Sequence, residues 1–176
     1  SSTKKIANQD NPVVSQNVEG KLIGGKSELG YLFRWNEFST PTALYNLQNA
    51  GLITKVSTNT LSFEIDGTTE NFSYGTIYVP ASGQNLNTDE IHSLITTCAK
   101  TSGVDFYGLS TGLSPIGIDL GSGSFANLTK PEILIFTGGS SSSRDAGEIW
   151  HLFDQRYKIP ITLTETSGLR NLNIIK

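Results

Sequence analysis

Residues 132–164 read EILIFTGGSSSSRDAGEIWHLFDQRYKIPITLT, and this stretch decides the fold that the sequence predicts. It begins with an apolar run, Glu132 to Thr137, that is typical of a strand buried on both faces. An amphipathic helix is expected from about Asp145 to Tyr157, and a second β-rich run follows at 159–164. Strand, helix and strand in this order predict a β-α-β unit with parallel strands, because the helix returns the chain to the same end of the sheet.

The same pattern recurs earlier in the chain. Further strands are expected at 30–35, 52–56, 61–65, 74–79 and 104–109. One helix is expected between Ser39-Thr40-Pro41 and Gly51, and a longer one between Asn87 and Gly103. Residues 113–131 predict a long loop, and 172–176 look like the start of another strand. We therefore predict a flavodoxin-like α/β three-layer sandwich with a mostly parallel sheet, cut from a larger chain.

Composition narrows the functions that the chain can have. It has 176 residues, a formal net charge of −3 and one cysteine. No lysine or arginine cluster could neutralise a run of phosphates, so we expect no nucleic acid partner. No stretch approaches the roughly 20 apolar residues of a membrane span, so we expect no membrane partner. The abundance of serine, threonine and asparagine over lysine and glutamate favours an extracytoplasmic protein, periplasmic or secreted.

Residues 108–112, GLSTG, match the glycine-x-serine-x-glycine pattern of a hydrolase nucleophile elbow. In such an elbow a helix follows the serine, and a histidine from elsewhere acts as the base. The residues after Gly112 are too rich in proline, glycine and serine for a helix to start. The two histidines, His92 and His151, both fall within predicted helices. We therefore expect Ser110 to lie in a glycine-rich turn, with a serine hydrolase as the rival function.

Two other groups could carry chemistry. Cys98 falls on the apolar face of the second predicted helix, where a free cysteine is usually a small buried hydrophobic residue. Glu148, His151 and Asp154 follow one another at i+3 spacing in the third predicted helix, which places them near one face. These three residues would supply only part of the ligands of a metal site. The chain has no His-x-x-Glu with a distant second histidine that could complete it. A solvated helix face is expected there, and no cofactor.

The loop after the strand of the quoted stretch is the strongest candidate for a binding site. It joins the carboxyl end of a buried strand to a helix N-terminus, the edge at which open α/β sheets bind ligands. Gly138 and Gly139 permit close backbone approach, Ser140 and Ser141 offer hydroxyls, and Arg144 can pair with a carboxylate or phosphate. The loop matches neither of the glycine-rich nucleotide-binding patterns. It predicts a small polar or anionic ligand, with an ordinary capped loop as the alternative.

Three blocks of the chain resemble one protein family. They are YLFRW at 31–35, FYGLSTGLSPIGIDLGS at 106–122, and PEILIFTGG at 131–139 with DAGEIWHLFD at 145–154. These blocks are similar to the region that follows the catalytic domain in bacterial zinc carboxypeptidase-like proteins, especially those of the Bacteroides lineage. In that family the region runs into a class I glutamine amidotransferase-like domain. The resemblance covers roughly residues 28 to 176.

Composition and the resemblance together imply how the chain is divided. Residues 1–27 are polar and are expected to form an extended lead, followed by an α/β lobe at 28–126. Residues 127–176 are expected to begin a glutamine amidotransferase-like unit, packed as one globule with the preceding lobe.

The resemblance also implies a function. The family's zinc ligands belong to the preceding peptidase domain, and no residue here matches them. The elbow cysteine of the amidotransferase domain is also lacking. We therefore expect a non-catalytic accessory or ligand-binding module of a metallocarboxypeptidase-like hydrolase, with the preceding peptidase domain of the same polypeptide as its partner. The alternatives are a stand-alone flavodoxin-like domain for small ligands, and a serine hydrolase using Ser110.

Overall fold

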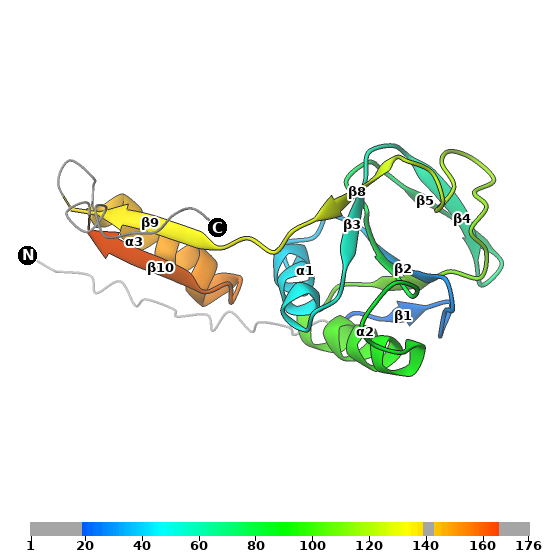
Figure 1. Ribbon diagram of the computed structural model, residues 1–176, viewed down its shortest axis with the longest axis horizontal. Coiled ribbons are helices and arrows are strands. Elements are labelled where there is room, and N and C mark those ends of the chain that lie inside the picture. The colour runs from blue at the N-terminus through cyan, green and yellow to red at the C-terminus, as the bar shows by residue number, and fades with distance from the viewer. Residues whose placement is uncertain (1–18, 139–142, 166–176) are drawn as a thin grey trace, which may run out of the picture.

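The computed structural model describes residues 19–138 and 143–165, which form a main body and a smaller C-terminal unit (Figure 1). The main body is built on a six-stranded sheet with the strand order β1-β7-β2-β6-β3-β8. These strands are β1 Leu22–Ile23, β2 Gly30–Phe33, β3 Thr54–Ser57, β6 Ile77–Pro80, β7 Phe106–Gly108 and β8 Phe125–Leu128. Two helices, α1 Thr40–Asn49 and α2 Thr88–Ser102, and a hairpin of β4 Leu61–Ile65 and β5 Thr68–Phe72 complete the body.

The sheet is mixed, so the predicted flavodoxin-like sandwich with a mostly parallel sheet is wrong. Of the pairings in this sheet, β1 with β7 is parallel. The pairings of β2 with β6 and β7, and of β3 with β6 and β8, are antiparallel.

Two interleaved β-α-β units explain the error. The unit β2-α1-β3 returns β3 parallel to β2, but β6 lies between these two strands. In the same way β6-α2-β7 returns β7 parallel to β6, with β2 between them. The order β7-β2-β6-β3 with this chain path is the split β-α-β arrangement of ferredoxin-like folds. The strands joined by helices do run parallel, but they are not neighbours.

A separate hydrophobic core lies on each face of the sheet. Successive strand side chains point to opposite faces, so Tyr31 and Phe33 of β2 face one core and Leu32 faces the other. The first core joins the sheet to α1 and α2, and it contains Ala43, Leu47, Ile91, Ile95, Cys98 and Phe106. The second joins the sheet to the β4–β5 hairpin, and it contains Leu61, Phe63, Ile65, Phe72, Tyr78 and Tyr107. The layers are therefore helices, sheet and hairpin.

Helix α2 begins and ends where its sequence predicts. The Asn87 side chain accepts a hydrogen bond from the backbone N–H of Glu90 at 3.0 Å, and the Glu90 carboxylate accepts from the Asn87 N–H at 2.9 Å. This capping box satisfies two backbone groups that the first turn leaves free. At the other end Gly103 has φ +76°, the left-handed conformation that terminates many helices.

The C-terminal unit is a β-α-β motif. Strands β9 Ile133–Thr137 and β10 Ile161–Glu165 pair in parallel, and α3 Ser143–Trp150 connects them, which confirms the topology predicted for this stretch. The predicted helix is not uniform, because residues His151–Arg156 continue it as a π-helix, η1. The unit lies to one side of the main body (Figure 1). It meets α1 through Tyr157, whose carbonyl accepts from the Thr42 hydroxyl at 2.9 Å. The Tyr157 ring also packs against Phe38, just before α1, with 5.3 Å between the ring centroids.

Candidate functional site

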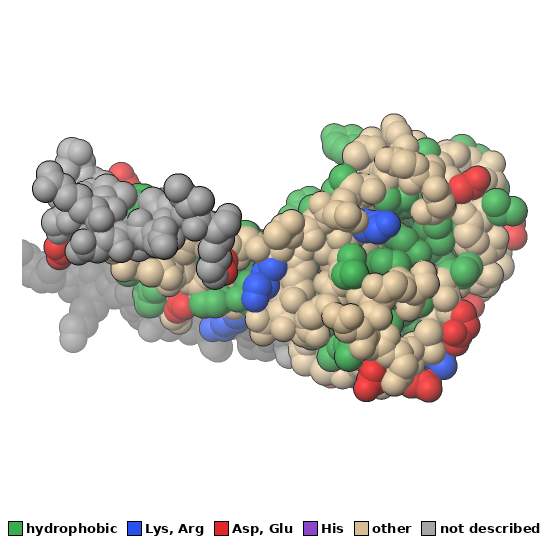
Figure 2. All heavy atoms as spheres, in the orientation of Figure 1, with side chains coloured by type: hydrophobic (Ala, Val, Ile, Leu, Met, Phe, Trp, Pro, Cys, Tyr) green, Lys and Arg blue, Asp and Glu red, His purple; other side chains and the backbone are tan. Residues whose placement is uncertain are grey.

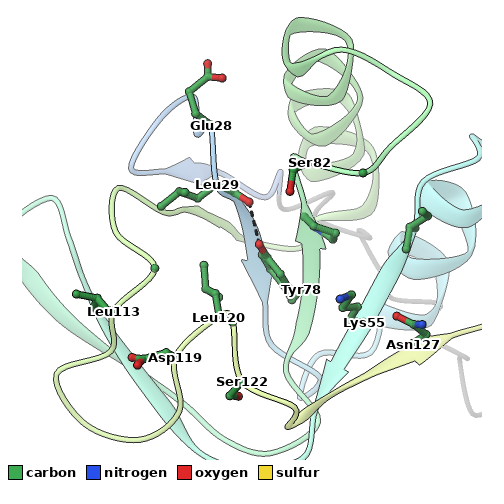
Figure 3. A pocket seen from close by; sticks show the side chains of 15 residues that line it. Glu28, Leu29, Lys55, Tyr78, Ser82, Leu113, Asp119, Leu120, Ser122 and Asn127 are labelled. Atoms are coloured by element: carbon green, nitrogen blue, oxygen red, sulfur yellow. Dashed lines mark hydrogen bonds between the residues drawn. The ribbon is translucent and has the colours of Figure 1, made fainter.

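A groove of about 1060 Å³ opens on the hairpin side of the six-stranded sheet (Figure 3). Its floor is formed by Tyr78 from β6, Lys55 from β3 and Asn127 from β8. Lys55 is the register partner of Tyr78 on one side and of Asn127 on the other. Because register partners on neighbouring strands project from the same face, the three side chains form one row across the sheet.

The groove is the half of this sheet face that the hairpin leaves open. The row of side chains continues from Tyr78 to Leu32 of β2 and Tyr107 of β7. These three residues belong to the core beneath the β4–β5 hairpin. Toward β3 and β8 the cover ends, and Lys55 is half-buried while Asn127 is exposed. Figure 2 shows hydrophobic side chains gathered in a hollow of the main body, with a lysine or arginine beside them.

The loop at 109–124 forms one wall of the groove, and it is anchored to the hairpin. The Ser62 N–H donates to the Ser114 hydroxyl at 3.2 Å, and that hydroxyl donates to the Ser62 carbonyl at 2.8 Å. Within the loop, Asp119 Oδ1 accepts from the Ser114 N–H at 2.7 Å. Leu113, Asp119 and Leu120 line the groove from this loop (Figure 3). This loop therefore builds one wall of the groove.

One glycine allows the loop to approach the hairpin closely. Gly117 forms a bridge with Leu61 of β4, and it has φ +105°, a conformation that side chains rarely permit. A Cβ at this position would overlap the carbonyl oxygen of Thr60.

The charges of the groove are divided between its two sides. The Lys55 ammonium makes no ion pair or hydrogen bond with the residues that the structure describes. Two acids, Glu28 and Asp119, also line the groove, and Asp119 lies across it from Lys55 (Figure 3). Tyr78 donates its hydroxyl hydrogen to the Leu29 carbonyl at 2.8 Å, and burial raises the pKa of this phenol, so it stays neutral at physiological pH.

Ser110 lies in an exposed turn just beyond β7. No helix forms between residues 109 and 124, all of which the structure describes, so the helix of a nucleophile elbow is missing here. The imidazole of His92 contacts the Tyr31 hydroxyl, with 3.3 Å between Nδ1 and the oxygen. His151 belongs to the C-terminal unit, in η1. Neither histidine hydrogen-bonds to Ser110.

The predicted ligand loop is described only at its ends. Gly138 has φ +82°, whereas Gly139, Ser140 and Ser141 lie outside the described residues. Arg144 is exposed, and its Nε lies 3.9 Å from Glu148 Oε1 one turn along α3. An exposed pair of this kind contributes little to stability.

The possible metal ligands do not form a metal site. Glu148 belongs to α3, while His151 and Asp154 lie in η1. Glu148 and His151 line one shallow cavity together with Arg144 and Arg156, whereas Asp154 does not line it. Asp154 accepts a hydrogen bond from the Gln155 amide at 2.6 Å. Across residues 19–138 and 143–165, no group of three or more His, Cys, Asp or Glu side chains could hold a metal ion.

Cys98 is buried between α2 and α1. Its thiol lies 3.6 Å from the Ala43 carbonyl oxygen, and burial raises the pKa of the thiol to about 11. At neutral pH the group is protonated and therefore a poor nucleophile.

Sequence reasoning missed the groove because its floor comes from three strands far apart in the chain. The one available signal was Lys55, a cation inside the β-rich run 52–56. Its neighbours Thr54 and Val56 point to the helix side of the sheet, so Lys55 had to point to the other side. Without the register, nothing linked it to Tyr78 or Asn127.

Fold and site together define a split β-α-β domain with a groove on the sheet face opposite its helices. Comparison of the chain with protein-family models, curated proteins and solved structures found no match. None of the helices described is long and apolar enough to cross a membrane.

Proposed function

We propose that this chain is a non-catalytic accessory module of an exported zinc carboxypeptidase-like protein, acting beside a peptidase domain of the same polypeptide. The three blocks that resemble this family suggest the assignment. The observation that supports a non-catalytic module is the structure of the loop at 109–124. Hydrogen bonds of Ser114 and Asp119 hold this loop in place as a wall of the groove. Ser110 sits in the same loop, exposed and without a hydrogen bond from either histidine.

A fluorophosphonate probe tests the non-catalytic part. The native chain is incubated with the probe and analysed by intact-mass spectrometry and peptide mapping, with Ser110→Ala and the urea-unfolded chain as controls. We expect no adduct on Ser110, since no base among the described residues hydrogen-bonds to its hydroxyl and activates it. An adduct that appears in the native chain and is lost on unfolding would show that Ser110 is an activated nucleophile, and the proposal would be abandoned.

The coding sequence upstream of Ser1 tests the assignment to the peptidase. We expect it to encode a domain with a His-x-x-Glu pair and a later histidine, the ligand set of a catalytic zinc. If such a domain is present, its activity on C-terminal residues can be measured with and without this module. A coding sequence with no such domain would contradict the assignment.

A further inference from the structure

We propose that the groove over β3, β6 and β8 binds a short peptide, with the peptide's α-carboxylate at Lys55 and Asn127 and its amino end toward Asp119. The inference rests on the groove residues alone. It stands or falls independently of the assignment to a zinc carboxypeptidase-like protein.

Lys55 and Asn127 form the end of the groove that suits a carboxylate. They are register partners on adjacent antiparallel strands, so their Cβ atoms lie roughly 4.5–5.5 Å apart. The ammonium and the side-chain amide are both hydrogen-bond donors, and neither makes a hydrogen bond with a described residue. Two donors side by side match the two oxygens of a carboxylate. The half-buried position of Lys55 strengthens the bond to an anion, because less water competes for the charge.

The rest of the groove selects a peptide among carboxylates. Leu120 offers apolar surface between the basic and acidic sides, and Leu29 adds apolar lining, which an inorganic anion would not use (Figure 3). Asp119, on the far side, would repel a second negative charge, so a dicarboxylate or a nucleotide fits poorly. A short peptide is a zwitterion with apolar side chains between its charges. The volume of about 1060 Å³ lies just above the range for small-ligand sites, roughly 300–1,000 Å³, and leaves space for several residues.

The test is a titration followed by ¹⁵N-resolved NMR, with trileucine as the probe and its C-terminal amide as the matched ligand. The wild-type chain is expected to bind trileucine at least about tenfold more tightly than the amide, as loss of a charge-assisted hydrogen bond implies. Lys55→Met should bind the acid and the amide equally and weakly. Lys100→Met, which removes an exposed lysine of α2 outside the groove, should behave like the wild type.

The acidic side has its own test on the same protein. N-acetyl-trileucine should bind the wild type more weakly than trileucine, while Asp119→Asn should bind the two alike. This variant retains an oxygen that can accept from the Ser114 N–H, so the wall keeps its anchor. Lys55→Arg keeps the cation and should preserve the preference for the acid, which separates recognition from a folding defect.

Three results would overturn the proposal. The first is equal affinity of wild type for trileucine and its amide, and the second is an undiminished preference for the acid in Lys55→Met. The third is that trileucine perturbs no resonance of β3, β6 or β8 up to its solubility limit. Each result concerns the groove alone, so it leaves the fluorophosphonate outcome unaffected.

Discussion

Replacing Arg34 with methionine is predicted to destabilise the main body by about 1.5–4 kcal/mol, the sum of the contributions set out below. Arg34 follows β2, and its guanidinium lies over two rings, 4.7 Å from the centroid of Phe72 and 4.5 Å from that of Tyr107. Its Nη2 pairs with Glu70 Oε2 at 2.5 Å and donates to the Asn71 carbonyl at 3.2 Å. One side chain thus joins the sheet to the β4–β5 hairpin.

The magnitude follows from these contacts and from their exposure. Removing one partner of a fully buried ion pair costs about 3–5 kcal/mol. The side chains of Arg34 and Glu70 are 25% and 26% exposed, so water can partly rehydrate the remaining carboxylate, and we expect roughly 1–2 kcal/mol from this source. The two ring contacts add about 0.5–2 kcal/mol. Methionine keeps part of the apolar contact, so the loss is mainly that of the charge and its hydrogen bonds.

Urea unfolding of four chains measures the effect: wild type, Arg34→Met, Glu70→Gln and the double variant. The double-mutant cycle should give a coupling of roughly 1 kcal/mol or more between Arg34 and Glu70. Lys100→Met is the control for loss of an exposed cation and should stay within about 0.5 kcal/mol of wild type. If Arg34→Met also stays within this limit, or if the coupling is zero, the guanidinium does not fasten the hairpin and the reasoning is refuted.

Three other predictions concern the helix core and the groove wall. Burial raises the pKa of the Cys98 thiol to about 11, so little reactive thiolate is present in the native chain at pH 8. The native chain should therefore react with a disulfide reagent at roughly one hundredth or less of the rate of the urea-unfolded chain. Comparable rates for the two chains would refute the burial of Cys98. The raised pKa of Cys98 also contributes to the free energy of unfolding. This contribution is fully present below the unfolded-state thiol pKa of about 8.5 and is lost as pH rises toward 11. In urea unfolding, Cys98→Ala should remove the decrease in stability between these two pH values. Gly117→Ala should lower the free energy of unfolding in urea by about 1–3 kcal/mol, because of the unfavourable φ and the overlap with Thr60. Gly121 lies in the same loop, and a Cβ there would meet no atom within 4 Å, so Gly121→Ala should lower the free energy of unfolding by less than about 0.5 kcal/mol. Equal losses in the two glycine variants would contradict the close approach at Gly117.

The local elements of this fold could be predicted from sequence, but the neighbours of each strand could not. The capping residues Asn87 and Glu90 and the terminal Gly103 act within a few residues of chain, so their signals are complete in the sequence. The helix connections also indicated correctly that β2 and β3 run in the same direction. Whether another strand lies between β2 and β3 depends on the path of the chain after the hairpin. The strand β6 lies there, and it pairs with β2 although the two are more than 40 residues apart in the sequence.

The candidate sites show the same division between local and distant information. The prediction grouped Glu148, His151 and Asp154 because it assumed α-helical spacing throughout. Residues His151–Arg156 form a π-helix instead, and local composition gives no signal of this change. For Ser110 the local sequence was informative, because residues that prevent a helix lie directly after it. The groove required the registers of three strands, which a single sequence does not contain.

The split β-α-β frame and one wall of its groove come from separate stretches of the chain, and this separation bears on how binding could change. The floor at Lys55 and Tyr78 belongs to frame strands, whereas one wall comes from the loop at 109–124. The β4–β5 hairpin does not line the groove, but it anchors this loop through Ser62 and Ser114. The hairpin interrupts the frame between β3 and β6, and the loop lies between β7 and β8. Insertions and substitutions in this loop can therefore alter which ligand is accepted while the helix core stays intact. For protein engineering, the domain is a scaffold with one replaceable loop beside a floor that carries the Lys55 cation.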